Sequence, residues 1–244
     1  MLIITGICVQ TLIGADDKIT KDIPREDYYI YHTIPDAVIQ TQKGKITLYQ
    51  LLKEGPLLFT MVYTRCGGVC YPFIFSLKKA VNRVGGLGKD YQILVISFDP
   101  MDTPQTMRAM AQAEGLADNE NWIFGTTSQE SIKQVASSIG YWAKWDSTRK
   151  QYDHPAVLIG LNKKGKILRF LVGASVPPVR LAEVINEIRG KFIPSYPLPR
   201  KNVIFSCFQY DPEKGIRLDW GFLLLLLPGI ITLGGTLWIF RRHL

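Results

Sequence analysis

The chain has 244 residues, 47% of them hydrophobic, which excludes a disordered or fibrous protein and suffices for one core of ordinary size. Its 29 Lys and Arg side chains outnumber the 21 Asp and Glu side chains, and the formal net charge is +8. Residues 141–201 hold 12 basic and 4 acidic side chains, whereas residues 1–140 hold 13 and 14. This distribution argues against a diffusely basic nucleic-acid-binding protein and indicates one positive face.

The N-terminal end predicts an export signal. Residues 2–15 are uncharged, mostly apolar and short for a membrane span, and they end in small residues. We therefore expect a signal peptide over residues 1–15, with Cys8 inside it, followed by a polar linker or first extended segment over residues 16–35.

Residues 36–192 have the pattern of one α/β domain. Strands are expected at residues 38–41, 45–48, 56–63, 92–98, 122–124, 141–145, 156–161 and 167–172. Helices are expected from the cysteine pair described below to residue 84, and at residues 103–114, 128–139 and 178–189. Thr103-Pro104 predicts one helix start, and Thr127 with Glu130 predicts a capping box for the next helix. The alternation of strand and helix predicts one central sheet.

Two cysteines, Cys66 and Cys70, lie between a buried strand and the start of a helix. A helix N-terminus stabilises thiolate, so at least one thiol should have a lowered pKa. Their spacing places both sulfurs on one helical face if the first turn includes Cys66. Three intervening residues suit a soft ion such as Cu(I) and still allow a disulfide, so we interpret the pair as a metal or redox pair. The alternative is a structural or incidental disulfide.

His154 is the candidate third ligand. His32 lies in the N-terminal segment and His243 follows the C-terminal apolar stretch, whereas His154 directly precedes the strand expected at 156–161. In an α/β sheet, a loop there can approach the helix start after a neighbouring strand. A Cys, Cys, His set is compatible with copper as Cu(I) or Cu(II), with Asp153 orienting the imidazole. The alternative is a surface or capping histidine.

The C-terminal end predicts a membrane anchor. Residues 221–240 carry no charge and, at about 1.5 Å per residue, reach across a hydrocarbon core of about 30 Å. With Trp220 and Trp238 at its edges, the transmembrane helix is placed at residues 220–240. The basic side chains of residues 241–244 place this tail in the cytoplasm and the domain on the other side of the membrane.

Residues 193–219 are expected to form a proline-containing linker followed by the element Cys207-Phe-Gln-Tyr-Asp-Pro212. Cys207 has two interpretations. It is an unpaired small residue beside the membrane, or an accessory thiol for redox exchange or copper transfer.

Three separated motifs resemble, in order, those of the Sco/SenC family. They are Tyr63-Thr64-Arg65-Cys66-x-x-x-Cys70, the segment Ser97-Phe98-Asp99-Pro100-x-Asp102-Thr103-Pro104, and the pair Asp153-His154 before a strand. The resemblance covers residues 36–190, and the tail is similar to that of a bacterial subset with a C-terminal anchor.

The resemblance implies a thioredoxin-like fold, with a mixed central sheet flanked by helices, and copper binding through Cys66, Cys70 and His154. It implies a membrane-anchored protein that helps to assemble the dinuclear copper site of cytochrome c oxidase subunit II, as copper donor, thiol reductase or both. The domain would then lie on the periplasmic side of the inner membrane. Asp99 and Asp102 match family positions near the site, where they anchor loops or act in the chemistry. A copper or redox sensor that only docks to partners is a third interpretation.

The chain departs from the family pattern around the ligands. Gly67-Gly68 stands where Pro-Asp is usual, and Tyr71 intervenes before Pro72. Loss of the carboxylate should make the site less negative and the loop more flexible, which we expect to alter copper affinity. Pro155 follows His154, and a cis bond there would match the cis-proline that faces the cysteines in thioredoxin-like folds.

The basic stretch brackets His154 in the sequence. We expect its side chains to form a basic rim around the site: Lys144, Arg149, Lys150, Lys163, Lys164 and Lys166. This rim is either a solvated surface or a contact surface for an acidic client or anionic lipid.

Overall fold

The computed structural model describes residues 24–191, 208–211 and 215–218, together with four single residues of the C-terminal segment, Gly229, Thr232, Trp238 and Arg241. The chain divides into two compact units, Met1–Phe192 and Ile193–Leu244. The expected signal peptide, with Cys8, and the accessory thiol Cys207 lie outside the described residues.

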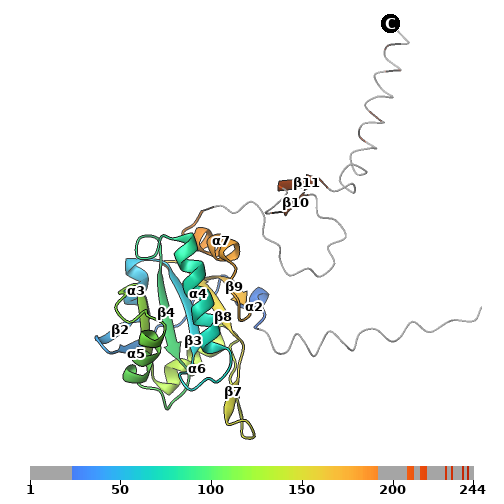
Figure 1. Ribbon diagram of the computed structural model, residues 1–244. Helices are drawn as coiled ribbons and strands as arrows, with labels where there is room; N and C mark the ends of the chain where they lie inside the picture. Colours follow the sequence, from blue (N-terminus) through green and yellow to red (C-terminus); the bar gives the residue numbers. More distant parts are fainter. Residues whose placement is uncertain are drawn as a thin grey trace, which may run out of the picture. The chain divides into compact units, whose positions relative to one another are not determined.

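A seven-stranded mixed sheet forms the centre of the first unit (Figure 1), with the strand order β2-β1-β5-β4-β3-β8-β9. Its strands are β1 (Val38–Thr41), β2 (Gly44–Thr47), β3 (Leu57–Val62), β4 (Gln92–Ser97), β5 (Trp122–Thr126), β8 (Val157–Leu161) and β9 (Ile167–Val172). β3, β4 and β5 run parallel, whereas β3 and β8 pair antiparallel. All six residues of β3 are buried, as its continuous apolar sequence predicts.

Helices flank this sheet (Figure 1). They are α2 (Glu26–Tyr29), α3 (Leu48–Glu54), α4 (Cys70–Val84), α5 (Pro104–Ala113), α6 (Gln129–Ser138) and α7 (Pro178–Ile188). Helices α4 and α7 pack against each other, and α5 packs along β5. The architecture is the thioredoxin-like α/β fold expected from the sequence.

A separate hairpin positions the candidate histidine. Strands β6 (Lys144–Asp146) and β7 (Gln151–Asp153) pair antiparallel outside the main sheet and extend from the body of the unit (Figure 1). His154 directly follows β7 and precedes β8. The strand expected at 141–145 therefore begins only at Lys144, because its partner is the hairpin strand and not the central sheet.

Two local predictions need correction. Ser128, not Thr127, is the N-cap of α6: its Oγ accepts a hydrogen bond from Ser131 N, while the Thr127 hydroxyl donates to the carbonyl of Val38 in β1. Part of the expected linker 16–35 also belongs to the domain, since α2 packs near β9 and the Glu26 carboxylate accepts from Phe170 N. The start of α5 at Thr103-Pro104 is confirmed, with Thr103 accepting from Thr106 N.

The described part of the second unit is an antiparallel hairpin of β10 (Phe208–Asp211) and β11 (Gly215–Leu218). Within the transmembrane helix expected at 220–240, only Gly229, Thr232 and Trp238 are described, so this prediction falls almost wholly outside the described residues. Among the residues that are described, no helix combines the length and the apolar character that a membrane span needs.

Candidate metal and redox site

The two cysteines and His154 meet at one end of the sheet. Cys66 lies in the loop after β3, Cys70 is the first residue of α4, and His154 lies between β7 and β8. Because β3 and β8 are antiparallel neighbours, the end of β3 adjoins the beginning of β8. His154 Nε2 is 3.5 Å from Cys70 Sγ and 3.9 Å from Cys66 Sγ, and the three donor atoms lie within 4.8 Å of one another.

Cys66 lies just before the helix and not on its first turn. The two sulfurs meet because the loop curls back, so that the backbone N–H of Cys70 points to Cys66 Sγ at 3.5 Å. The shared helical face expected from the spacing is therefore replaced by a turn that caps the N-terminus of α4. This position exposes the Cys66 sulfur to the unpaired N–H groups of the helix start.

The two thiols have opposite electrostatic environments. Hydrogen bonds from the Cys70 thiol, from His154 and from the backbone of Cys70 and Gly68 lower the pKa of Cys66 to about 3, against the effect of burial. The hydrogen bond to Cys66, together with burial, raises the pKa of Cys70. The site thus holds one thiolate and one thiol, which is the arrangement of a reactive cysteine pair.

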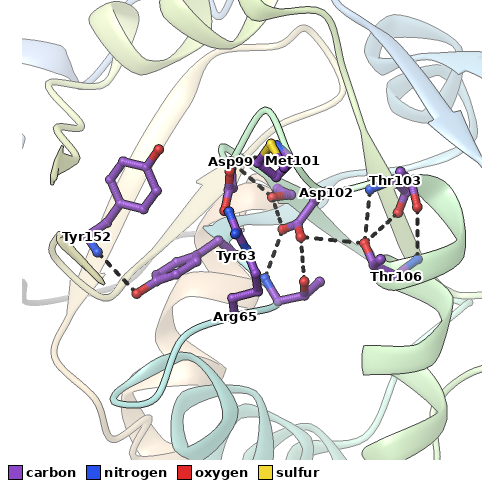
Figure 2. Close-up of polar contacts among 10 residues, drawn as sticks. Tyr63, Arg65, Asp99, Met101, Asp102, Thr103, Thr106 and Tyr152 are labelled. Atoms are coloured by element: carbon purple, nitrogen blue, oxygen red, sulfur yellow. Dashed lines mark hydrogen bonds and ion pairs between the residues drawn. The ribbon is translucent and has the colours of Figure 1, made fainter. Parts of the chain in front are cut away.

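Asp102 fixes the loop that leads into Cys66. Its buried carboxylate accepts hydrogen bonds from Thr64 N at 2.8 Å, from the Thr64 hydroxyl and from Ser97 Oγ at the end of β4. Figure 2 shows the same carboxylate reaching Thr106 at the start of α5, where Thr103 and Thr106 cap the helix. One carboxylate therefore ties the ends of two parallel strands together.

Asp99, which is also buried, fixes the same loop through Arg65. Its side chain forms an ion pair with Arg65 at 2.6 Å and accepts from Met101 N at 3.0 Å (Figure 2). Tyr71, the residue that departs from the family pattern, donates its hydroxyl to the carbonyl of Thr64. Of the two roles considered for Asp99 and Asp102, these contacts correspond to loop anchoring.

We expect the variant Asp102→Ala to lose about 3 kcal/mol of unfolding free energy, since it leaves buried donors of Thr64 and Ser97 without their acceptor. Urea unfolding of the full chain measures the change. The exposed Asp118, replaced by alanine, is the matched control and should change stability by less than about 0.5 kcal/mol. Equal effects of the two substitutions would contradict the anchoring role.

The imidazole of His154 has other partners than the sequence suggests. Nδ1 lies 3.0 Å from Tyr141 Oη and 3.2 Å from the carbonyl oxygen of Pro155. Both carboxylate oxygens of Asp153 accept from Arg149 at 2.7 Å instead. The orienting role expected for Asp153 therefore falls to Tyr141 and Pro155. The described residues contain no cis peptide bond, so the His154–Pro155 bond is trans.

Aromatic rings surround this imidazole. The ring centroids of Tyr63 and Phe98 lie 5.6 and 5.2 Å from that of His154, and Tyr152 packs edge-on against both aromatic residues. Tyr63 Oη also accepts from Tyr152 N, which joins the hairpin to the end of β3 (Figure 2). Apolar walls of this kind limit water around the sulfur and nitrogen donors.

Gly67 lets the hairpin close on the cysteine loop. A Cβ built at Gly67 would lie 2.6 Å from Gln151 Nε2, so the amide of Gln151 fills the space that a side chain would take. Gly68 has room, since a Cβ there would approach only Cys66 Sγ, at 4.0 Å. Gly67 departs from the family pattern, and Gln151 of β7 packs closely against it.

The expected basic rim divides into two groups. Lys144, Arg149 and Lys150 belong to the hairpin that leads to His154. Lys163 and Lys164, with Lys166, lie in the turn between β8 and β9, at the far end of β8. Five strand residues at about 3.4 Å each separate the two groups by roughly 17 Å. Only the hairpin group is placed to meet a partner at the site.

Tyr141 was not among the residues singled out from the sequence. No spacing pattern links it to His154, 13 residues away, because the contact depends on the path of the hairpin between them. The sequence indicated this contact only in that Tyr141 lies near His154 along the chain.

A thioredoxin-like domain in which two thiols and an imidazole converge defines a thiol protein with a site for a soft metal ion. The family model described as SCO1/SenC matches residues 31–189, and the chain belongs to this family. The family resemblance predicted from the three motifs is thereby confirmed. No curated protein matches the chain.

Solved structures share the fold. A putative electron transfer protein from Aquifex aeolicus VF5 is 22% identical, with a TM-score of 0.62, over 66% of this chain and 95% of that chain. The copper-bound ScoI of Bradyrhizobium japonicum is 21% identical, with a TM-score of 0.54, over 66% and 100%. BsSco, described as a member of the Sco family of cytochrome c oxidase assembly proteins with a disulfide switch, is 21% identical, with a TM-score of 0.56, over 65% and 94%.

The donor set fits copper. Two cysteine sulfurs suit Cu(I), and an imidazole suits copper in both oxidation states. Zinc would normally take a fourth ligand. Among the described residues, Cys66, Cys70 and His154 form the one group of three such side chains close enough to hold a metal ion.

Proposed function

We propose that this protein is a membrane-anchored copper chaperone that delivers copper to the dinuclear copper site of cytochrome c oxidase subunit II, or matures that site. The convergence of Cys66, Cys70 and His154 carries the proposal. Membership of the SCO1/SenC family, the bound copper of ScoI and the assembly role stated for BsSco support it.

Copper is the cargo of this site. Cys66 contributes a sulfur that is already ionised, the Cys70 thiol releases its proton to solvent, and His154 supplies Nε2. The ion leaves by exchange of these ligands for those of the client. Because the loop is held by Asp99 and Asp102, the sulfurs keep their separation while one ligand after another is replaced.

The proposed location rests on the two ends of the sequence. The apolar stretch 221–240 would anchor the protein in the inner membrane, with residues 241–244 in the cytoplasm. The signal over residues 1–15 would place the domain in the periplasm. Alkaline extraction of membranes and protease protection of the tail test both statements.

A second function is favoured by the unequal thiols. The Cys66 thiolate can attack a client disulfide to form a mixed disulfide, and the Cys70 thiol, after losing its proton, then attacks Cys66. The products are a Cys66–Cys70 disulfide and a client dithiol. Two electrons pass to the client, and its two thiols take one proton from the Cys70 thiol and one from solvent. A thiol reductase of this kind would hold copper only incidentally.

Mixing the protein with subunit II separates the two functions. The copper-loaded full chain should transfer copper to reduced apo subunit II, and His154→Ala should strongly reduce the amount transferred while leaving the reduction of an oxidised client intact. Copper in each partner is measured by metal analysis after separation, and client thiols by alkylation and mass spectrometry. Electron transfer without copper transfer would overturn the chaperone and support the reductase.

Charge variants of the same experiment test the client surface. We expect Lys144→Glu with Lys150→Glu to slow the transfer and to flatten its salt dependence, because these lysines lie on the hairpin beside the site. The matched control is Lys163→Glu with Lys164→Glu, which changes the net charge equally at the far end of β8. Equal slowing by both pairs would indicate an unspecific effect of charge.

A further inference from the structure

The two ring nitrogens of His154 face different partners. Nε2 faces the sulfurs of Cys70 and Cys66, whereas Nδ1 faces the Tyr141 hydroxyl at 3.0 Å and the Pro155 carbonyl oxygen at 3.2 Å. A neutral imidazole carries one N–H and one bare nitrogen. Whichever nitrogen holds the proton therefore decides whether the ring can bind a metal ion through Nε2.

The Tyr141 hydroxyl has His154 Nδ1 as its hydrogen-bond partner in the metal-free protein. The residue is 6% exposed, and among the residues that the structure describes its hydroxyl contacts His154 Nδ1. A buried O–H without an acceptor is costly, so this hydroxyl donates to Nδ1. The ring then carries its proton on Nε2, where it points to the Cys66 thiolate.

Metal binding requires the opposite tautomer. Only Nε2 faces the sulfurs, so Nε2 must be bare for the ring to complete the site, and the neutral ring then carries N–H at Nδ1. The Pro155 carbonyl can only accept a hydrogen bond. The Tyr141 hydroxyl rotates and can either donate or accept.

We propose that Tyr141 is the positioning residue of His154, with a hydroxyl that donates to Nδ1 in the metal-free protein and accepts from Nδ1–H once copper is bound. The ring passes its Nε2 proton to solvent and takes a proton from solvent at Nδ1. The loaded half of this inference rests on the proposed copper function, whereas the metal-free half does not.

The tautomer is read directly by ¹⁵N NMR of the full chain with labelled histidine, reduced and at mildly alkaline pH. The metal-free protein should show the Nε2–H tautomer for His154, a slowly exchanging Tyr141 hydroxyl proton and a scalar coupling from it to Nδ1. In Tyr141→Phe, Pro155 O is the remaining partner of Nδ1, and the ratio of Nδ1–H to Nε2–H should rise about five- to thirtyfold.

Tyr91→Phe is the matched control. It removes a buried hydroxyl of the same kind, bonded to the Gly85 carbonyl, and should leave the tautomer of His154 unchanged. Adding Cu(I) to the unchanged protein should convert His154 to the Nδ1–H tautomer with bare Nε2 as the ligand.

The proposal is overturned by an Nδ1–H tautomer in the metal-free protein, or by equal tautomer ratios in the unchanged protein and Tyr141→Phe. If Tyr141→Phe does not fold, the scalar coupling in the unchanged protein decides: its presence supports the proposal and its absence overturns it. A protein that shows the metal-free pattern but takes up no Cu(I) contradicts the copper function and leaves the role of Tyr141 in the metal-free state intact.

Discussion

At about pH 5, Cys66 is expected to remain a thiolate while Cys70 remains a thiol. The pKa of Cys66 is lowered to about 3, first by the hydrogen bond from Cys70, and the pKa of Cys70 is raised by the same hydrogen bond and by burial. The ultraviolet absorbance of thiolate measures the result in a chain whose Cys8 and Cys207 are replaced by serine. One equivalent of thiolate should persist through the acidic range and disappear only as the pH falls towards 3.

The direction in which stability changes with pH follows from the difference in pKa between the folded and unfolded states. A thiol whose pKa is lower in the folded than in the unfolded state stabilises the fold when ionised, and this contribution is lost as the pH falls through the folded value. Cys70→Ala should raise the pKa of Cys66, because the largest favourable contribution disappears, whereas Cys70→Ser retains an O–H donor and should preserve most of the effect. Absorbance that disappears already near neutral pH would refute the assignment.

The second large effect is the loss of copper when one ligand is removed. Cys66→Ser should lower Cu(I) affinity by at least about 100-fold, since loss of a supporting residue alone costs about 10- to 100-fold and here a thiolate ligand is removed. His154→Ala should retain part of the Cu(I) affinity through two thiolates. It should lose Cu(II) and the thiolate-to-Cu(II) absorption band, because Cu(II) depends more strongly on the imidazole.

Competition with a Cu(I) chelator and the visible spectrum of the Cu(II) form measure these two losses. His32→Ala is the control for the histidine, since His32 is exposed and lies outside the group of three. Cys207→Ser is the control for the cysteine and also tests whether Cys207 takes part in binding. Unchanged copper uptake in Cys66→Ser would remove the basis of the proposed function.

The sequence predicted those parts of the site that depend on local pattern. The buried run of β3, the helix after Cys70 and the candidate ligand His154 could all be found, because each follows from composition or from a motif along a few residues. The family match over residues 31–189 confirms the recognition made from the same motifs.

What could not be predicted depends on pairings between distant segments. The lysines around 163 seemed to adjoin His154 because they are near in sequence, but β8 carries them to its far end. The partner of the imidazole is Tyr141 and not Asp153, because the hairpin turns Asp153 towards Arg149. Ser128 took the capping role of Thr127 once the Thr127 hydroxyl bonded to Val38 in a neighbouring strand.

The contacts of Asp102 and His154 affect the order in which the chain folds and binds copper. They join Thr64 to a carboxylate 38 positions later, and His154 meets the cysteines only across 84 and 88 positions. Contacts between such distant positions form when the central sheet is complete, and their closure is a slow part of folding. An incompletely folded or misfolded chain contains both cysteines, but His154 does not lie beside them. The complete set of three donors therefore forms only in the folded domain, and a chain released early would bind copper more weakly, through its two cysteines alone.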